Sequence, residues 1–430
     1  MTTADFLIKG ASLPDGKKAD ISISNGVIAS VGSGFKGEAH TVIDGKDCVV
    51  LPGLVDLHTH LREPGREDAE TVLSGSSAGV KGGFTAVSAM ANTSPVADTA
   101  GVVEQVYRLG QEAGLLDVFP IGAVTEGLKG ESLSEIGAMA DSVARVRVFS
   151  DDGNCVSDPL VMRRALEYIK KFGGVIAQHA QDPRMTIGSQ MNEGEISARL
   201  GLKGWPAVAE EAIIARDVLL ADHVKSRLHI CHLTTAGGVE IIRWAKARGI
   251  DVTAEVTPHH LLLTDDLASS YDPVYKVNPP LRTESDVHAL REALADGTID
   301  IVAGRSRWIS KGNSGRTIPP SRVNTRGFSE VNKDPRILAA SGSVTNPNEG
   351  DPDFLEDASR IYVSMSTEID RKFMVFEGQD QKPTVPGEFQ ARLDDRERAF
   401  VCPTSPDFVF PCKDVSLHLV SQYCFEKMGY

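Results

Sequence analysis

The chain has 430 residues, with 45 basic and 59 acidic side chains and a formal charge of −14. This acidic balance argues against a surface for nucleic acid or for anionic membranes. A hydrophobic fraction of 41% and a charged fraction of 24% are ordinary for globular proteins, which excludes bulk disorder. No apolar run is long enough for a membrane-spanning helix, and the N-terminus lacks the apolar region of a signal peptide. Six cysteines without a CxxC pair predict no disulfide scaffold, so we expect a cytoplasmic protein.

Residues 1–50 predict the strands of a small β-domain. Asn25-Gly26 lies between two of them and is a hairpin signal. The expected strands are Asp5–Lys9, Asp20–Ser24, Val27–Val31 and Val42–Val50.

From residue 51 onwards, apolar strands alternate with helical segments. Alternation of this kind predicts parallel strands joined by helical crossovers, and about eight strands favour a (β/α)₈ barrel over an open sheet. The expected strands are Gly53–His58, Phe84–Met90, Asp117–Val124, Arg145–Asp151, Gly174–His179, Arg227–His232, Asp251–Thr257 and Asp300–Ala303. Among the expected helices are Glu70–Lys81, Pro159–Phe172, Ala207–Asp222, Gly237–Ala247 and Glu284–Leu294.

The composition changes near residue 303. Ten of the 11 histidines lie before residue 304, so the chemistry that needs imidazole belongs to that part. We therefore divide the chain into a β-strand portion (1–50), a metal-binding barrel (51–303) and a C-terminal region (304–430). In the last region, 360–367 and 372–377 read as strands, and 342–352 reads as a loop.

His58 and His60 form the strongest chemical signal. They are two residues apart at the end of a predicted strand, so both imidazoles point to the same side of it. In a barrel this end of the strand is the catalytic rim. Two imidazoles on one face supply half of a divalent-metal site, and the alternative is a pair of structural histidines.

Three more candidate ligands follow later strands. Asp152 closes the fourth strand, His179 the fifth and His232 the sixth. Polar residues at the ends of apolar strands need partners, which a pair of metal ions would supply. Asn92 follows the second strand, where its amide can hydrogen-bond a substrate.

Other polar residues allow two interpretations. Arg62 suits a substrate carboxylate, because its planar fork binds two oxygens, or it forms an ion pair with Glu63 or Glu67. Asn278 is either a substrate contact or a turn residue. His259 and His260 are either functional or structural. The remaining histidines are expected at the surface or in packing: His40, His223, His229, His288 and His418.

Seven segments together resemble the bacterial dihydroorotases of the amidohydrolase superfamily. The resemblance runs from about residue 5 to Ala303. The segments are VDLHTHLREPG (55–65), AMANTSPVAD (89–98), FSDDG (149–153), AQHAQDP (177–183), HICHLTTAGGVE (229–240), AEVTPHHLLL (254–263) and KVNPPLR (276–282).

This resemblance implies an α/β fold, with a (β/α)₈ TIM-type barrel and a small β-sandwich built from both chain ends. It implies two zinc ions, with His58 and His60 on one, His179 and His232 on the other, and Asp152 as the bridge. It also implies that Arg62, Asn92 and Asn278 hold dihydroorotate or N-carbamoyl-L-aspartate. The implied reaction is their reversible interconversion, a step of pyrimidine biosynthesis, and a homodimer is expected.

The resemblance stops at the eighth strand. There the family has an aspartate that acts as a metal ligand and general base, whereas this chain has Arg305. An arginine cannot accept a proton and would repel two zinc ions. Asp300 faces the opposite side of a regular strand and is no obvious substitute. A carboxylate of the C-terminal region, such as Asp334, Asp351 or Asp353, is another candidate.

Nothing after Ala303 resembles the family. A fused gene, a shifted reading frame and a variant with a replaced C-terminal third all remain open, and the abrupt change favours the first two. Without the family's last helix and rim, we expect lower stability than an intact relative has.

Three functions follow from these observations. The first is a zinc dihydroorotase, impaired by the loss of the aspartate. The second is a non-catalytic scaffold that partners aspartate carbamoyltransferase. The third is another cyclic-amide hydrolase, such as a hydantoinase or an allantoinase, although the REPG and NPPLR segments favour dihydroorotate.

Overall fold

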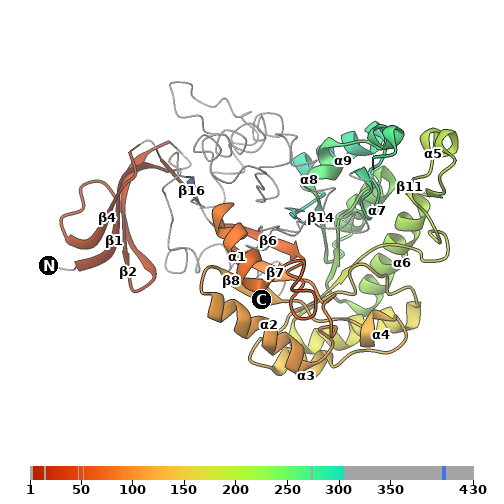
Figure 1. Cartoon of the computed structure of the whole chain (residues 1–430), viewed down its shortest axis with the longest axis horizontal. Coiled ribbons are helices and arrows are strands. Elements are labelled where there is room, and N and C mark those ends of the chain that lie inside the picture. The colour runs from red at the N-terminus through yellow and green to blue at the C-terminus, as the bar shows by residue number, and fades with distance from the viewer. Residues whose placement is uncertain are drawn as a thin grey trace.

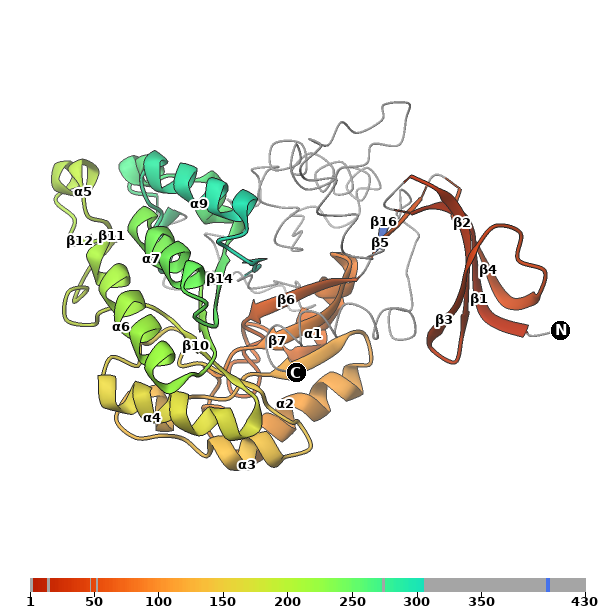
Figure 2. The same cartoon turned by 180° about the vertical axis from the view of Figure 1, so that it is seen from behind.

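The structure is a computed structural model that describes residues 3–13, 16–46, 48–51, 53–272, 275–304 and 400–402. An N-terminal sheet stands apart from a larger α/β body, and both views show this separation (Figures 1 and 2). Within the described ranges, no helix has the length and apolar character needed to cross a membrane. The predicted strands at 360–367 and 372–377 and the loop at 342–352 lie outside these ranges.

The N-terminal strands form one mixed sheet in the described residues. Its order is β16-β5-β1-β2-β3, and β4 pairs with β1. The predicted hairpin is confirmed, because Asn25 and Gly26 join β2 to β3 with φ of 52° and 72°. The strands are β1 (Thr3–Ser12), β2 (Lys18–Ser24), β3 (Val27–Gly32), β4 (Glu38–Asp44), β5 (Val49–Leu51) and β16 (Phe400–Cys402).

The single strand expected at Val42–Val50 is wrong, because β4 and β5 occupy this range with a turn between them. Gly45 lies in the turn, and its N–H donates to the carbonyl of Lys9 at 2.8 Å. A Cβ at Gly45 would come within 2.8 Å of the Ala11 Cβ, so close backbone approach requires glycine there.

β16 joins the N-terminal sheet by pairing antiparallel with β5, with Phe400 opposite Leu51. The resemblance implied that both chain ends contribute to this small β-domain, but sequence patterns did not predict a strand at 400–402. This strand shows that a segment from the C-terminal region contributes to the sheet begun by the N-terminus.

Eight parallel strands within residues 53–304 follow one another in chain order. They form a three-stranded sheet and a five-stranded sheet, which a parallel bridge between Gly122 and Phe149 connects. The Gly304 N–H donates to Asp56 Oδ1 at 3.0 Å, which brings the end of the last strand to the first. The predicted barrel fold is confirmed. The strands are β6 (Leu54–Thr59), β7 (Phe84–Ala89), β8 (Asp117–Pro120), β9 (Val148–Phe149), β10 (Val175–Gln178), β13 (Leu228–Ile230), β14 (Val252–Val256) and β15 (Ile301–Val302).

Helices cover the outside of these strands, and some of them begin at a residue whose side chain caps the first N–H groups. Asp158 accepts hydrogen bonds from the N–H groups of Leu160 and Val161, and Thr283 forms a capping box with Asp286. The helices are α1 (Val72–Lys81), α2 (Ala100–Ala113), α3 (Ile136–Asp141), α4 (Pro159–Ile169), α5 (Glu195–Leu200), α6 (Val208–Val224), α7 (Ala236–Ala247), α8 (Pro258–Leu262) and α9 (Glu284–Asp296). Short 3₁₀ turns cover Glu126–Leu128, Lys170–Phe172 and Asp265–Ser270.

One excursion interrupts the alternation after β10. It contains two short parallel strands, β11 (Met191–Asn192) and β12 (Gly204–Trp205), with α5 between them. Figure 2 shows this excursion just before the start of α6.

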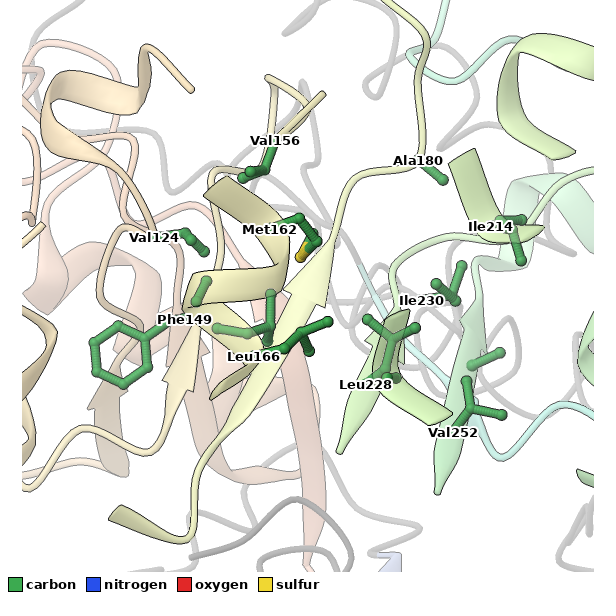
Figure 3. Close-up of a cluster of buried hydrophobic side chains, with 14 of the residues drawn as sticks. Val124, Phe149, Val156, Met162, Leu166, Ala180, Ile214, Leu228, Ile230 and Val252 are labelled. Atoms are coloured by element: carbon green, nitrogen blue, oxygen red, sulfur yellow. The ribbon is translucent and has the colours of Figure 1, made fainter. Parts of the chain in front are cut away.

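The main core lies between the helices and the five-stranded sheet. Phe149, Leu166, Ile214 and Ile230 are completely buried there. Figure 3 shows that α4 presents Met162 and Leu166 toward these strands. Burial of such side chains stabilises each by roughly 1.5–3 kcal/mol, so this packing holds the strand ends in place.

Candidate metal centre

His58 and His60 lie side by side at the end of β6. His58 is completely buried, and its ring centre is 5.3 Å from that of His60. The backbone N–H of His58 donates to Asp56 Oδ1. The two-residue spacing therefore places both imidazoles on the inner side of the barrel, as the strand geometry predicts.

Asp152 lies at the centre of four imidazoles. Its Oδ2 is 3.4 Å from Nε2 of both His58 and His60. Its Oδ1 is 3.2 Å from His179 Nδ1 and 3.0 Å from His232 Nε2. The carboxylate thus divides the four histidines into two pairs, one at each oxygen. The structure brings together all five residues that the sequence marked as metal ligands.

Three of these imidazoles have their second nitrogen bonded to an oxygen. His58 Nδ1 is 2.6 Å from Glu255 Oε1, and His60 Nδ1 is 3.0 Å from Asn92 Oδ1. His179 Nε2 is 2.8 Å from Gln181 Oε1. These oxygens accept hydrogen bonds, so the proton of each neutral ring belongs on the nitrogen that points away from Asp152.

This tautomer leaves bare nitrogen lone pairs opposite a carboxylate. His58 Nε2 is buried and has no hydrogen-bond partner among the described residues. Two acceptors facing each other repel, whereas a cation between them satisfies both. At metal sites the second nitrogen of a bound histidine usually donates to an oxygen in the same way. Donor type and geometry therefore fit divalent metal ions.

Three groups of side chains have the spacing of a metal site within the described residues. Asp152 belongs to two of them, which agrees with a bridging position. The groups are His58/His60/Asp152, Asp152/His179/His232 and His58/Cys231/Glu255.

Sequence reasoning missed Glu255 and the bond that joins it to His229. Glu255 Oε2 is 3.2 Å from His229 Nε2, and His229 Nδ1 is 2.8 Å from Thr253 Oγ1. His229 is buried, which confirms its expected packing role. The available signal was the alternation of β14, which places Thr253 and Glu255 on the same side of the strand.

Electrostatics ties Glu255 to His58. Burial alone would raise the pKa of Glu255, but His58 and His229 hold it well below its usual range. Burial opposes the charged form of His58, but Asp152 and Glu255 raise its pKa well above the usual value. A proton and a divalent ion compete for Nε2, so the same two carboxylates that favour a proton there also favour a metal ion on the neutral ring. A cluster with this charge distribution attracts cations.

The predicted substrate residues occupy different surroundings. Asn92 lies in the cluster, where its Nδ2 donates to the Asp152 carbonyl at 3.4 Å. Arg62 is half-buried with φ of 65°, and Asn278 is exposed. Glu63 and Glu67, the alternative partners of Arg62, accept hydrogen bonds from the N–H groups of Val72 and Gly65.

The structure favours a structural role for His260. Its two nitrogens lie 2.7 Å from Thr257 Oγ1 and 3.1 Å from the carbonyl of Pro279. His259 is buried beside it, with ring centres 4.3 Å apart.

Asp300 faces away from the metal-site cluster, which confirms that it is no substitute base. It accepts from the Ala254 N–H at 2.9 Å and pairs with Lys246 of α7 at 2.7 Å. Arg305 lies outside the described residues, as does His418. The same holds for the candidate carboxylates of the C-terminal region, which are Asp334, Asp351 and Asp353.

Comparison with known proteins decides the family. A family model described as "Dihydro-orotase-like" matches residues 47–237. The dihydroorotase of Streptomyces coelicolor is 70% identical over 297 residues, which are 69% of this chain and 69% of that protein. The dihydroorotase of Leifsonia xyli subsp. xyli is 69% identical over 303 residues, covering 70% and 69% respectively. The chain belongs to the dihydroorotase family. The prediction of a dihydroorotase-type hydrolase of cyclic amides is thereby confirmed.

The fold is shared more widely than the family. The solved L-hydantoinase (dihydropyrimidinase) from Arthrobacter aurescens has a TM-score of 0.59 and 25% identity, covering 70% of this chain and 69% of that one. The much higher identity to the dihydroorotases favours that family over the hydantoinases.

Proposed function

We propose that this chain interconverts N-carbamoyl-L-aspartate and L-dihydroorotate in the cytoplasm, as a step of pyrimidine biosynthesis. The observation that carries the proposal is the buried Asp152 carboxylate between two pairs of imidazoles. The 70% identity to a dihydroorotase supports the choice of substrate.

The donor set suits two zinc ions. His58 and His60 would hold one, His179 and His232 the other, and Asp152 would bridge them. When bound, zinc would supply Lewis acidity, which activates water and polarises an amide carbonyl at neutral pH.

Three neighbouring side chains keep the proton of each neutral imidazole on the nitrogen that points away from Asp152. Glu255 and Asn92 accept from Nδ1 of His58 and His60, and Gln181 accepts from Nε2 of His179. Each acceptor fixes the tautomer and the ring orientation, so that the free nitrogens converge on Asp152.

Arg62, Asn92 and Asn278 are the proposed substrate contacts. A guanidinium binds a carboxylate with two parallel hydrogen bonds, and the amides of Asn92 and Asn278 can donate to the carboxylate or carbonyl oxygens of the substrate. Asn92 supports this role because it already contacts His60 and Asp152.

Arg305 would impair turnover. General acid–base catalysis requires a group that accepts a proton near neutral pH, and a guanidinium keeps its proton. We therefore propose that the chain binds metal and substrate but turns over slowly.

Ring opening of dihydroorotate, followed by ultraviolet absorbance on zinc-loaded full chain, tests this proposal. Arg305→Asp should raise the turnover rate by about 10²-fold or more, which is the usual contribution of a general base. Arg108→Asp, at an exposed position on α2, is the matched control and should leave the rate unchanged.

Three outcomes separate the alternatives. No turnover in either form with zinc bound would contradict the enzymatic proposal, and co-purification with aspartate carbamoyltransferase would then favour the scaffold. Ordinary turnover of the natural chain, unchanged in Arg305→Asp, would contradict impairment alone.

Light scattering tests the proposed homodimer.

A further inference from the structure

Arg282 ends the KVNPPLR segment, and its guanidinium is buried. The side chain is 1% exposed. Its Nε donates to Thr234 Oγ1 at 3.0 Å, and its Nη1 donates to Asn192 Oδ1 and to the Trp205 carbonyl, both at 2.9 Å. Nη2 lies 3.4 Å from Glu210 Oε2. The guanidinium therefore contacts four separate parts of the chain.

Glu210 continues this network toward the metal-site cluster. One of its oxygens accepts from the Thr234 N–H at 2.8 Å and from the Thr235 N–H at 3.2 Å, and the other accepts from the Thr234 hydroxyl. Thr234 is two residues beyond His232, so the Arg282–Glu210 pair fixes the turn that follows this histidine.

The network also encloses the segment that contains Asn278. The Asp265 N–H donates to the Arg282 carbonyl at 2.9 Å, and Asn192 Nδ2 donates to Asp265 Oδ2 at 2.7 Å. At the other end of the segment, Lys276 Nζ donates to Gln190. Residues 276–282 are thus attached at both ends to neighbouring rim loops.

These contacts join the loops that follow three successive barrel strands. Asn192 and Trp205 belong to the excursion after β10, Thr234 follows β13, and Asp265 lies after β14. In a barrel, the loops after the strands form the substrate-binding end. A planar fork with five fixed donors can hold several acceptors in one arrangement, which a lysine cannot do.

Stability alone is a weak reason for this arrangement. A buried ion pair contributes little net stability, because desolvation of both charges offsets their attraction. The effect of Arg282 on loop positions is clearer. Its side chain contacts the loops after β10 and β13, and Arg282 itself belongs to the loop after β14, so one residue fixes the relative positions of all three.

We infer that Arg282 is a positioning residue, which holds the rim loops and the segment carrying Asn278 in the conformation that binds substrate. This inference rests on the proposed function, because it takes dihydroorotate as the molecule bound at the rim.

The test compares Arg282→Lys with the natural chain by amide hydrogen exchange and by steady-state kinetics. Exchange should become faster together at 189–206, 232–236 and 264–283. The KM for dihydroorotate should rise about 10- to 100-fold, with kcat and zinc content nearly unchanged, since the chemical groups stay in place. Arg147→Lys is the matched control, because Arg147 also donates to two carbonyls, those of Ala140 and Val146, but just before β9 and away from the three loops.

Each outcome has a defined meaning. Unchanged exchange at the three loops, or looser loops with an unchanged KM, would overturn the positioning role. No turnover in either the natural chain or Arg305→Asp would contradict the proposed function, and binding of dihydroorotate measured by calorimetry would then replace KM. If Arg282→Lys does not fold, the double variant Arg282→Met with Glu210→Gln removes both buried charges and should show the same effects.

Discussion

Glu255 contacts residues from both halves of the metal centre. Its Oε1 is 2.6 Å from His58 Nδ1 and accepts from the His232 N–H at 3.2 Å. Its Oε2 lies 3.2 Å from His229 Nε2, within hydrogen-bond distance. One carboxylate therefore orients a side chain of the first pair and the backbone of the second.

Glu255→Gln should weaken zinc binding about 10- to 100-fold, because an acceptor behind a metal-binding histidine strengthens and orients it. Competition with a chromophoric chelator measures this affinity without any assay of turnover. Asp217→Asn is the control, as Asp217 is equally buried but bonds to Gln178 and Arg216. Equal zinc affinity in the natural chain and Glu255→Gln would exclude the role.

Asp217 gives stability a pH dependence. Burial raises its pKa to about 6, despite the neighbouring Arg216. Because the folded pKa is raised above the unfolded value, the stabilising contribution is complete below about pH 4 and is lost as pH rises through about 6. Between pH 4 and 7, the natural chain should lose about 2–3 kcal/mol relative to Asp217→Asn. Urea unfolding of both forms at several pH values measures this, and a constant difference would contradict it.

Local capping explains why several helices begin where the sequence predicts. Asp158 and Pro159 at the start of α4 satisfy the first N–H groups and preset the backbone. By contrast, the break at Gly45 depends on contact with β1, a long-range feature that strand periodicity does not contain.

Asp158→Ala should lower the free energy of unfolding by about 1 kcal/mol, because two N–H groups at the start of α4 lose their acceptor. Denaturant titration followed by circular dichroism measures the change. Asp158→Asn keeps a capping oxygen and should remain close to the natural chain. A loss of equal size in both variants would contradict the capping explanation.

At the scale of the whole molecule, the metal centre connects two sheets. His58 lies on β6 of the three-stranded sheet and His60 directly follows it, whereas His179 and His232 follow strands of the five-stranded sheet. Ions bound across Asp152 would therefore cross-link the barrel. The lower stability that we expect from the altered C-terminal region stays a prediction. If stability is low, this cross-link contributes a larger share of it.

Removal of zinc with a chelator should lower the melting temperature, and addition of zinc should restore it. A ligand at 100 times its Kd stabilises by about 2.7 kcal/mol. Asp152→Asn should show a much smaller shift, since the bridging charge is gone. Equal shifts in both proteins would place the bound zinc elsewhere.

The sequence by itself predicted the barrel strands, five of the described helices to within two residues of their starts, and the five candidate metal ligands. These features depend on short-range patterns: apolar runs, caps, the two-residue spacing of His58 and His60, and polar residues at strand ends. Strand alternation then carries the histidines to one rim, because parallel strands share that end.

Only the tertiary structure decided which residues support that centre. Glu255 meets His58 across 197 positions of the chain, and Arg282 meets Asn192 across 90. No local pattern encodes such pairs, because a buried carboxylate or guanidinium acquires its role from the partners that folding brings to it. Likewise, β16 joins the sheet of β5 through backbone hydrogen bonds that any extended segment can make.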